Sequence, residues 1–198
     1  MADNGLNVLV CAASRHGSTA EIATAIRDEL QRRGLRASLL TPAEVTTLDG
    51  YDAVVLGSAV YAGHWLEPAK DLVARCGDEL AARPVWLFTS GPVGKPQGRL
   101  ARAMSGDPVE LAEMKSATHA VEHRMFAGKL DHRLLPAPQR FALLFFRGLD
   151  GDFRDWTAIR QWAKEIATHL ELRGVNSPDR RVLVRPGPGS LKLSRQRD

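Results

Sequence analysis

The sequence contains little cysteine and no long hydrophobic run, and both absences exclude broad classes of protein. Only two cysteines, Cys11 and Cys76, occur among the 198 residues, and they lie far apart. A disulfide-stabilised secreted domain needs a denser pattern, so we expect two reduced thiols in the core of a cytoplasmic protein. No stretch approaches the roughly 20 apolar residues of a membrane-spanning helix, and residues 1–5 lack the basic and apolar regions of a signal peptide.

Two common nucleotide-binding signatures are also missing. A GxxxxGK[ST] loop requires a lysine before its hydroxyl residue, but none precedes Ser18 and Thr19, so hydrolysis of a nucleoside triphosphate is not expected. A GxGxxG dinucleotide-binding turn needs three glycines, and only Gly17 is present. A phosphorylated receiver domain needs an aspartate at the end of its third strand, where Ser58 stands in this sequence. These functions are therefore excluded.

Basic charge is concentrated at the C-terminus. The whole chain has a net charge of +4, and residues 174–198 hold six basic and two acidic side chains, so the preceding residues are neutral overall. This tail is rich in Pro, Gly, Ser and Arg and has little apolar surface to bury, so we expect it to be disordered. It is either a solvated end or a segment that touches an anionic surface such as lipid, and we expect no nucleic-acid partner.

What the chain does contain is a regular alternation of apolar strands and amphipathic helices. Strands are predicted near 8–13, 36–40, 53–57, 84–89 and 119–125, and helices near 18–33, 68–80, 109–115 and 156–172. This alternation predicts an α/β domain over residues 1–173, in which helices cover both faces of a doubly wound parallel sheet. Ligands of such sheets bind at the carboxyl ends of the strands, so the loops that follow the strands are the candidate site.

The first of these loops has the chemistry of a phosphate site. It reads Ser14-Arg15-His16-Gly17-Ser18-Thr19 and joins a buried strand to a helix. Ser18 or Thr19 is expected to cap the helix, and Gly17 permits a tight turn. A phosphate at this position accepts the free N–H groups of the helix and the hydroxyl protons, and it gains from the helix dipole.

Two further loops suit a flat ring. The second loop, Ala59-Val60-Tyr61-Ala62-Gly63-His64-Trp65, places two large aromatic side chains around a glycine. The third loop, Ser90-Gly91-Pro92-Val93-Gly94, offers backbone donors with little side-chain bulk. Aromatic faces stack on planar heterocycles, although Tyr61 and Trp65 are equally able to cover the sheet edge. One phosphate loop beside two ring loops predicts a site for flavin mononucleotide (FMN), and a deazaflavin presents similar groups.

Histidine supplies the candidate catalytic group. His64 lies beside the aromatic residues and changes charge near neutral pH, so it is the best candidate for proton transfer, or else it only orients the ligand through a hydrogen bond. His119 and His123 have no neighbouring cysteine or carboxylate pattern, so we expect no metal site.

The loops together resemble a known family. The segments Ser14–Thr19, Tyr51–Ser58 and Tyr61–His64 are similar to the flavodoxins, and especially to the branch related to menaquinone-dependent protoporphyrinogen oxidase. The resemblance covers roughly residues 6–172 and implies a five-stranded sheet of order 2-1-3-4-5. It also implies that residues 14 and 16–19 hold the FMN phosphate and that residues 59–63 and 90–94 hold the ring. His16 stands where flavodoxins commonly carry a second threonine.

A hydrophobic insert is expected at about residues 130–150. Its centre, Phe141-Ala142-Leu143-Leu144-Phe145-Phe146, is apolar on every side of a helix and is flanked by two arginines. Residues 134–147 suit a membrane interface, a wall of the flavin site, a homodimer contact or the core of the sheet itself. The resemblance implies a lipid-soluble quinone as redox partner, and hence a cytoplasmic protein peripheral to the inner face of a membrane.

Two classes of function remain. The first is an FMN-dependent oxidoreductase that passes electrons from a small donor, such as a porphyrinogen, to a quinone. The second is an electron carrier that docks onto partner proteins. Carrier flavodoxins are typically strongly acidic, which steers them to basic partners, whereas this domain is neutral. The charge therefore favours the enzyme.

Overall fold

The computed structural model describes residues 5–91, 107–130 and 151–175. The predicted segments that fall elsewhere are Pro92–Gly94, the hydrophobic insert from residue 131 and the basic tail from residue 176, and they lie outside the described residues. Within the described part, the principal elements in chain order are β1 (Asn7–Ala13), α1 (Ser18–Arg32), β2 (Arg36–Leu40), β3 (Ala53–Tyr61), β4 (His64–Trp65), α2 (Glu67–Ala81), β5 (Val85–Gly91), α4 (Leu111–Thr118), β6 (Glu122–Ala127), β7 (Lys129–Leu130), β8 (Gly151–Asp152) and α6 (Trp156–Val175).

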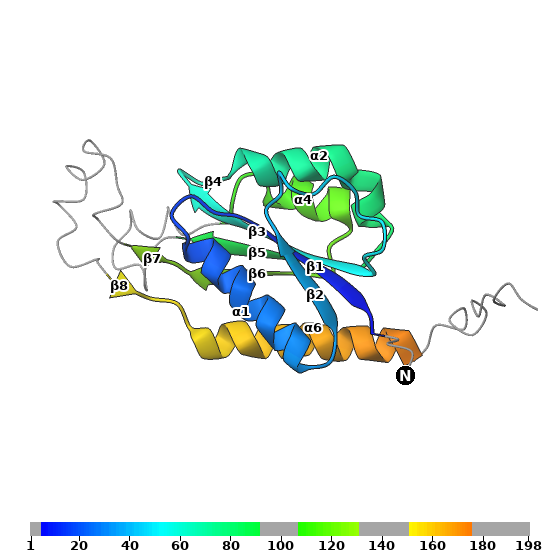
Figure 1. Ribbon diagram of the computed structural model, residues 1–198. Helices are drawn as coiled ribbons and strands as arrows, with labels where there is room; N and C mark the ends of the chain where they lie inside the picture. Colours follow the sequence, from blue (N-terminus) through cyan, green and yellow to red (C-terminus); the bar gives the residue numbers. More distant parts are fainter. Residues whose placement is uncertain (1–4, 92–106, 131–150, 176–198) are drawn as a thin grey trace, which may run out of the picture.

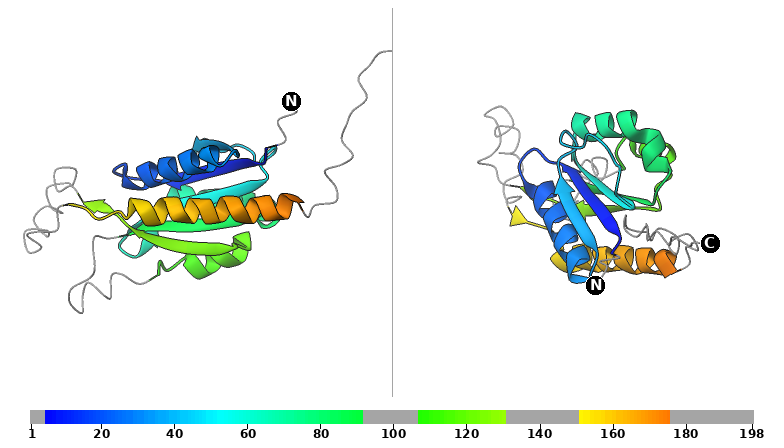
Figure 2. Two further views of the ribbon diagram at one scale, coloured as in Figure 1. Left: turned by 90° about the horizontal axis from the view of Figure 1, so that it is seen from below. Right: turned by 45° about the vertical axis from the view of Figure 1, so that its right-hand side comes forward.

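The central sheet has the predicted order. Its strands follow one another as β2-β1-β3-β5-β6, all parallel, and the short β4 pairs antiparallel with the end of β3. Helices α1 and α6 lie on one face, and α2 and α4 lie on the other (Figures 1 and 2). Counted among the parallel strands alone, this order is 2-1-3-4-5, so the predicted doubly wound architecture is confirmed.

Two hydrophobic layers hold the helices to the sheet. Strands β1, β3 and β5 are buried on both faces, because alternate side chains point into one layer or the other. The layer under α1 and α6 contains the packed rings of Phe88, Phe126 and Trp162. The layer under α2 and α4 contains Cys11, and burial there raises the pKa of its thiol to about 12. Both cysteines are free and buried, as expected.

Several element boundaries differ from the sequence prediction, and strand β5, for example, continues through Ser90 and Gly91 of the predicted third loop. Strand β3 continues through Tyr61, so Ala59 and Val60 belong to a strand and not to a loop. Helix α4 continues to Thr118, and His119 ends it in the left-handed conformation. The predicted strand from His119 is therefore wrong in its start, since the chain reaches the sheet only at Glu122.

None of the described helices is both long enough and apolar enough to cross a bilayer.

Candidate functional site

The loop between β1 and α1 is a tight turn organised by its own hydroxyl group. The Gly17 N–H donates to Ser14 Oγ at 3.1 Å, and Gly17 has a φ of 87°, which other residues rarely adopt. Gly17 itself is the N-cap, and none of the side chains that the structure describes caps the helix. The prediction that Ser18 or Thr19 provides the cap is wrong, because Ser18 already lies in the first turn and Thr19 is buried. Within the described part of the chain, the first N–H groups of α1 have no side-chain acceptor, which suits an anionic ligand.

The end of β3 approaches this loop. The Arg15 guanidinium carbon lies 5.3 Å from the centroid of the Tyr61 ring, and the His16 and Tyr61 rings are 6.1 Å apart in an edge-on arrangement. Burial raises the pKa of the Tyr61 hydroxyl, while the Arg15 charge partly opposes this shift. The first two predicted loops therefore meet at one rim of the sheet.

The second predicted loop is a β-hairpin. In the antiparallel pairing of β3 with β4, Val60 lies opposite Trp65 and Tyr61 lies opposite His64. The two turn residues, Ala62 and Gly63, have positive φ values of 50° and 83°. Such values are typical of the two-residue turns that match the twist of antiparallel strands.

Trp65 does not offer its ring to a ligand. Its side chain is packed in the layer under α2 at 2% exposure, and its indole N–H donates to Thr89 Oγ1 at 3.2 Å. The expectation that both aromatic residues stack on a flat ring is therefore wrong for Trp65, since alternation along β4 turns it inward and leaves His64 outward. Tyr61 remains as the aromatic residue of the rim.

Glu110 fixes the hairpin and was not identified from the sequence. Its Oε1 accepts a hydrogen bond from His64 Nδ1 at 2.7 Å, and its Oε2 accepts one from the Trp65 N–H at 3.2 Å. Lys70 Nζ lies 3.6 Å from the same Oε1, and the Val109 N–H donates to the Gly63 carbonyl. Partial burial opposes ionisation of Glu110, but the hydrogen bonds from His64 and the Trp65 N–H outweigh it, so the Glu110 pKa is lowered.

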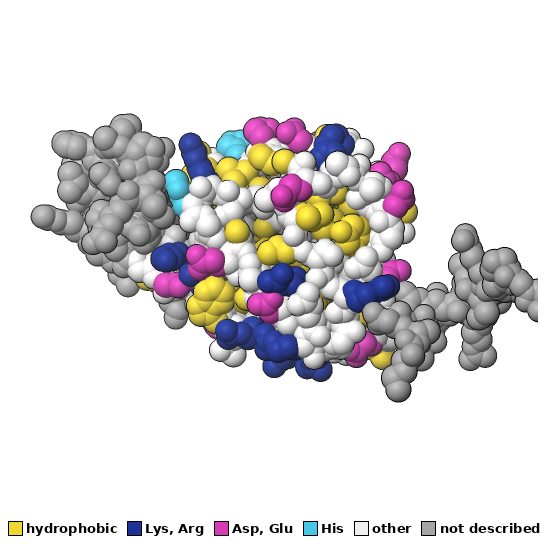
Figure 3. Space-filling view, viewed as in Figure 1, with side chains coloured by type: hydrophobic (Ala, Val, Ile, Leu, Met, Phe, Trp, Pro, Cys, Tyr) yellow, Lys and Arg dark blue, Asp and Glu magenta, His cyan; other side chains and the backbone are white. Residues whose placement is uncertain are grey.

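This contact defines the state of the His64 ring. An ionised carboxylate only accepts hydrogen bonds, so Nδ1 of His64 carries the proton and Nε2 is left for another partner. The His64 side chain is about half exposed. Histidine side chains are visible near the β4 end of the molecule in Figure 3.

The end of β5 supplies the third predicted loop in part. Ser90 and Gly91 close β5, and residues 92–94 lie outside the described part of the chain. Gly128, between β6 and β7, approaches this end so closely that a Cβ on it would stand 2.8 Å from the Gly91 carbonyl oxygen. The segment after β6 is therefore packed directly against the third loop.

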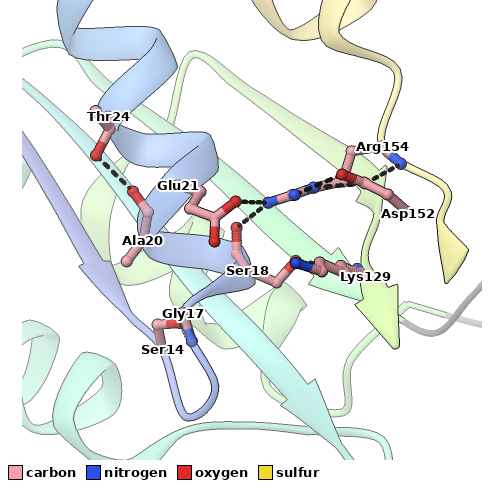
Figure 4. Close-up of polar contacts among 9 residues, drawn as sticks. All are labelled: Ser14, Gly17, Ser18, Ala20, Glu21, Thr24, Lys129, Asp152 and Arg154. Carbon is pink, nitrogen blue, oxygen red and sulfur yellow. Dashed lines mark hydrogen bonds and ion pairs between the residues drawn. The ribbon is translucent and has the colours of Figure 1, made fainter. Parts of the chain in front are cut away.

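A group of charged residues adjoins the start of α1 (Figure 4). The Arg154 guanidinium donates to both carboxylate oxygens of Asp152, at 2.6 and 2.7 Å, and to Glu21 Oε2 at 2.6 Å. The Lys129 N–H donates to Ser18 Oγ at 3.0 Å. Sequence reasoning missed Arg154, because its partner Glu21 lies 133 positions away and no periodic pattern links the two.

Comparisons with known proteins identify the family of this chain. A family model described as "Flavodoxin domain" matches residues 9–156. Protoporphyrinogen IX dehydrogenase (quinone) of Escherichia coli strain K12 is 25% identical over 177 residues, which cover 83% of this chain and 96% of that protein.

Solved structures show the same fold. A flavodoxin from the domain Archaea is 15% identical and superposes with a TM-score of 0.55, covering 84% of this chain and 99% of that one. A flavodoxin of Streptococcus pneumonia TIGR4 is 20% identical with a TM-score of 0.54, covering 83% and 99%. The flavodiiron core Flv1 of Synechocystis sp. PCC6803 gives a TM-score of 0.55 at 17% identity, and this chain covers 37% of it.

Proposed function

Because this chain belongs to the flavodoxin domain family, we propose that it binds FMN and acts as an FMN-dependent oxidoreductase. The observation that carries the proposal is the approach of Arg15 and His16 to Tyr61, which brings a phosphate-type loop and an aromatic residue to one rim. A nucleotide needs both features at one place. The match to a quinone-linked dehydrogenase over nearly its full length supports an enzyme of related chemistry.

The residues of the first loop fit the phosphate. The uncapped first turn of α1 offers backbone N–H groups, and Gly17 carries no side chain that would block access to them. The phosphate ligands that we propose are Ser14, Arg15, His16, Gly17, Ser18 and Thr19; of these, Thr19 is buried and is proposed to contribute through its backbone.

The ring is proposed to lie between the ends of β3 and β5. Tyr61 offers an aromatic face there, and Ala59, Val60, Ala62 and Gly63 shape the adjoining backbone. Ser90 and Gly91 lie at the end of the neighbouring strand, followed in sequence by Pro92, Val93 and Gly94. When bound, the flavin supplies the capacity to accept and release electrons, while the protein places it and controls its surroundings.

His64 is proposed to carry a proton at this rim. The Glu110 carboxylate holds its Nδ1–H, which leaves Nε2 able to accept a proton from a substrate and return it. Glu110 acts through His64, so it is a positioning residue. His64 pairs with Tyr61 across the hairpin, which supports a role for the histidine beside the proposed ring.

The proposed electron acceptor is a quinone and the proposed donor is a small reduced molecule such as a porphyrinogen. This assignment rests on the likeness to the Escherichia coli dehydrogenase and on the net charge of residues 1–173, which is zero, whereas an electron carrier steered onto a basic partner is typically strongly acidic. The alternative is an electron carrier of the flavodoxin type, because the solved flavodoxins have the same fold.

Steady-state turnover separates the two functions. The purified full chain is loaded with FMN and mixed with a soluble quinone and protoporphyrinogen, without any partner protein. Sustained quinone reduction at many turnovers per chain is the expected result. Reduction of the bound flavin with no turnover in the absence of a partner protein would identify a carrier. Parallel loading with a deazaflavin tests whether the same loops prefer that ring system.

A further inference from the structure

A buried arginine lies between two carboxylates beside the first turn of α1. The Arg154 side chain is only 3% exposed, and it bonds Asp152 through two nitrogens and Glu21 through a third. Its guanidinium also lies 4.3 Å from the centroid of the Trp156 ring. Figure 4 shows the guanidinium between the two carboxylates, beside Ser18 at the start of α1.

The arginine changes the charge that an anion meets at this helix end. Glu21 lies in the first turn of α1, where its negative charge competes with a phosphate for the same helix dipole. Glu21, Asp152 and Arg154 together carry a formal charge of −1, and the cluster would carry −2 without the arginine. The ion pair from Arg154 therefore reduces the repulsion that Glu21 exerts on a bound phosphate.

The same residues orient Ser18. Arg154 Nη1 donates to the Ser18 carbonyl oxygen at 3.4 Å, and the Lys129 N–H donates a hydrogen bond to Ser18 Oγ. Because Ser18 Oγ accepts that bond, its own proton remains available to donate to a phosphate oxygen. Lys129 and Asp152 are paired across the two-stranded β7–β8 ribbon, so the ribbon and the phosphate loop are held together.

We propose that Arg154 is a positioning residue of the phosphate subsite, which neutralises Glu21 and orients Ser18 without touching the ligand. The inference rests on the proposed binding of FMN. It predicts that the affinity for the phosphate group rises when the cluster becomes less negative and falls when the cluster becomes more negative. If the ion pair had only a structural role, every variant that breaks it would lower the affinity.

The test compares FMN with riboflavin, which has the same ring but no phosphate. Both dissociation constants are measured by flavin fluorescence at low ionic strength, and the ratio of the riboflavin constant to the FMN constant reports the phosphate contribution. Cluster charges are 0 in Glu21→Gln, −1 in wild type and in the double variant Glu21→Gln/Arg154→Gln, and −2 in Arg154→Gln. The ratio should fall in that order, by about two- to fivefold per unit of charge, and high salt should compress the differences.

The chain offers a matched ion pair on the same helix. Arg27 Nε and Asp28 Oδ1 are 2.6 Å apart, and both lie beyond the first turns of α1. The variants Arg27→Gln and Asp28→Asn should leave the ratio unchanged, since the influence of the helix end falls off within a turn. Their thermal unfolding provides the comparison for general loss of stability.

Three outcomes decide the matter. A ratio that is raised in Glu21→Gln and returns to the wild-type value in the double variant supports the inference even if the single variant Arg154→Gln does not fold, because the comparison of these two variants isolates the charge of the arginine. An unchanged or lowered ratio in Glu21→Gln, or an equal response in the Arg27 and Asp28 variants, overturns the inference while FMN binding stands. A wild-type chain that binds no FMN overturns the proposed function and the inference with it.

Discussion

Single residues determine how closely the elements of this protein approach one another. Gly57, in the middle of β3, lies directly under the ring of Phe88, and a Cβ at this position would stand 2.0 Å from Phe88 Cζ. Phe88 in turn packs against Phe126 and Trp162 beneath α6. The absence of one side chain therefore permits the aromatic packing that holds the last helix to the sheet.

Replacement of Gly57 tests this close approach. Gly57→Ala should lower the free energy of unfolding by about 1–3 kcal/mol, because the added methyl group forces Phe88 out of its position in a closely packed core. The measurement is urea-induced unfolding followed by tryptophan fluorescence. Gly77→Ala, beside the kink of α2 at Cys76, is the control: nothing lies within 4 Å of its added Cβ, so this substitution should not destabilise the fold by overpacking. Equal effects of the two substitutions would contradict this explanation.

The hydrogen bond between Glu110 and His64 can be tested by substitution. Glu110→Ala should lower turnover by roughly tenfold with little change in FMN affinity, because His64 loses a charge-assisted hydrogen bond worth about 1.4 kcal/mol. Glu110→Gln keeps an acceptor for His64 and should restore part of the activity while shifting the pH profile. Glu113→Ala, one turn further along α4 and exposed, serves as the control. A loss of turnover as large in Glu113→Ala would show that Glu110 does not act through His64.

At the scale of elements, the β3–β4 hairpin is the part of the site that depends most on turn geometry. Ala62 has a φ of 50°, a left-handed conformation that alanine adopts at a cost, and Gly63 follows with 83°. The Val109 N–H and Glu110 hold the hairpin from the α4 side. Hydrogen bonds from residues outside the turn therefore help to hold the hairpin in a conformation that is strained at Ala62.

Substitution of Ala62 should relieve that strain. Asparagine tolerates the left-handed region, so Ala62→Asn is expected to raise the free energy of unfolding by about 0.5 kcal/mol. Thermal unfolding measures the change. Ala112→Asn on the exposed side of α4 is the control and should instead destabilise, since asparagine is a poorer helix former than alanine. Destabilisation by both substitutions would show that the turn is not strained.

The sequence was sufficient to locate most elements, but it did not predict the extensions and contacts that depend on other strands. Apolar strands and helix periodicity are local signals, and they located β1, α1, β2, α2 and α6 within a few residues. The extension of β3 through Tyr61 depends on its pairing with β4, and the burial of Trp65 depends on Thr89 in another strand. Glu110 and Arg154 were missed for the same reason, because they meet their partners only after the sheet has formed.

At the scale of the whole molecule, ionised carboxylates contribute to stability at neutral pH. Hydrogen bonds from Thr41 lower the pKa of Glu44, and hydrogen bonds from Arg154 lower that of Asp152 despite some burial. For Glu110, burial opposes ionisation but the bonds from His64 and the Trp65 N–H outweigh it. A carboxyl group with a lowered pKa in the folded state stabilises the fold above its unfolded pKa.

Acid should therefore weaken the fold. Below about pH 4.5, the ordinary value for glutamate, the stabilisation decreases as these groups take up protons, and it is lost once the pH falls below their folded-state pKa values. Urea midpoints measured between pH 7 and pH 3 should fall on the acidic side, and Glu110→Gln should reduce the slope. A midpoint independent of pH over this range would contradict the assignment of these three carboxylates.

The proposed binding of FMN is tested by identifying the small molecule that copurifies with the full chain. Its absorbance spectrum and mass are recorded after mild denaturation, and the stripped protein is then titrated with FMN. We expect a yellow protein that releases FMN and binds it again with one site per chain. A colourless protein that takes up no added FMN would contradict this proposal.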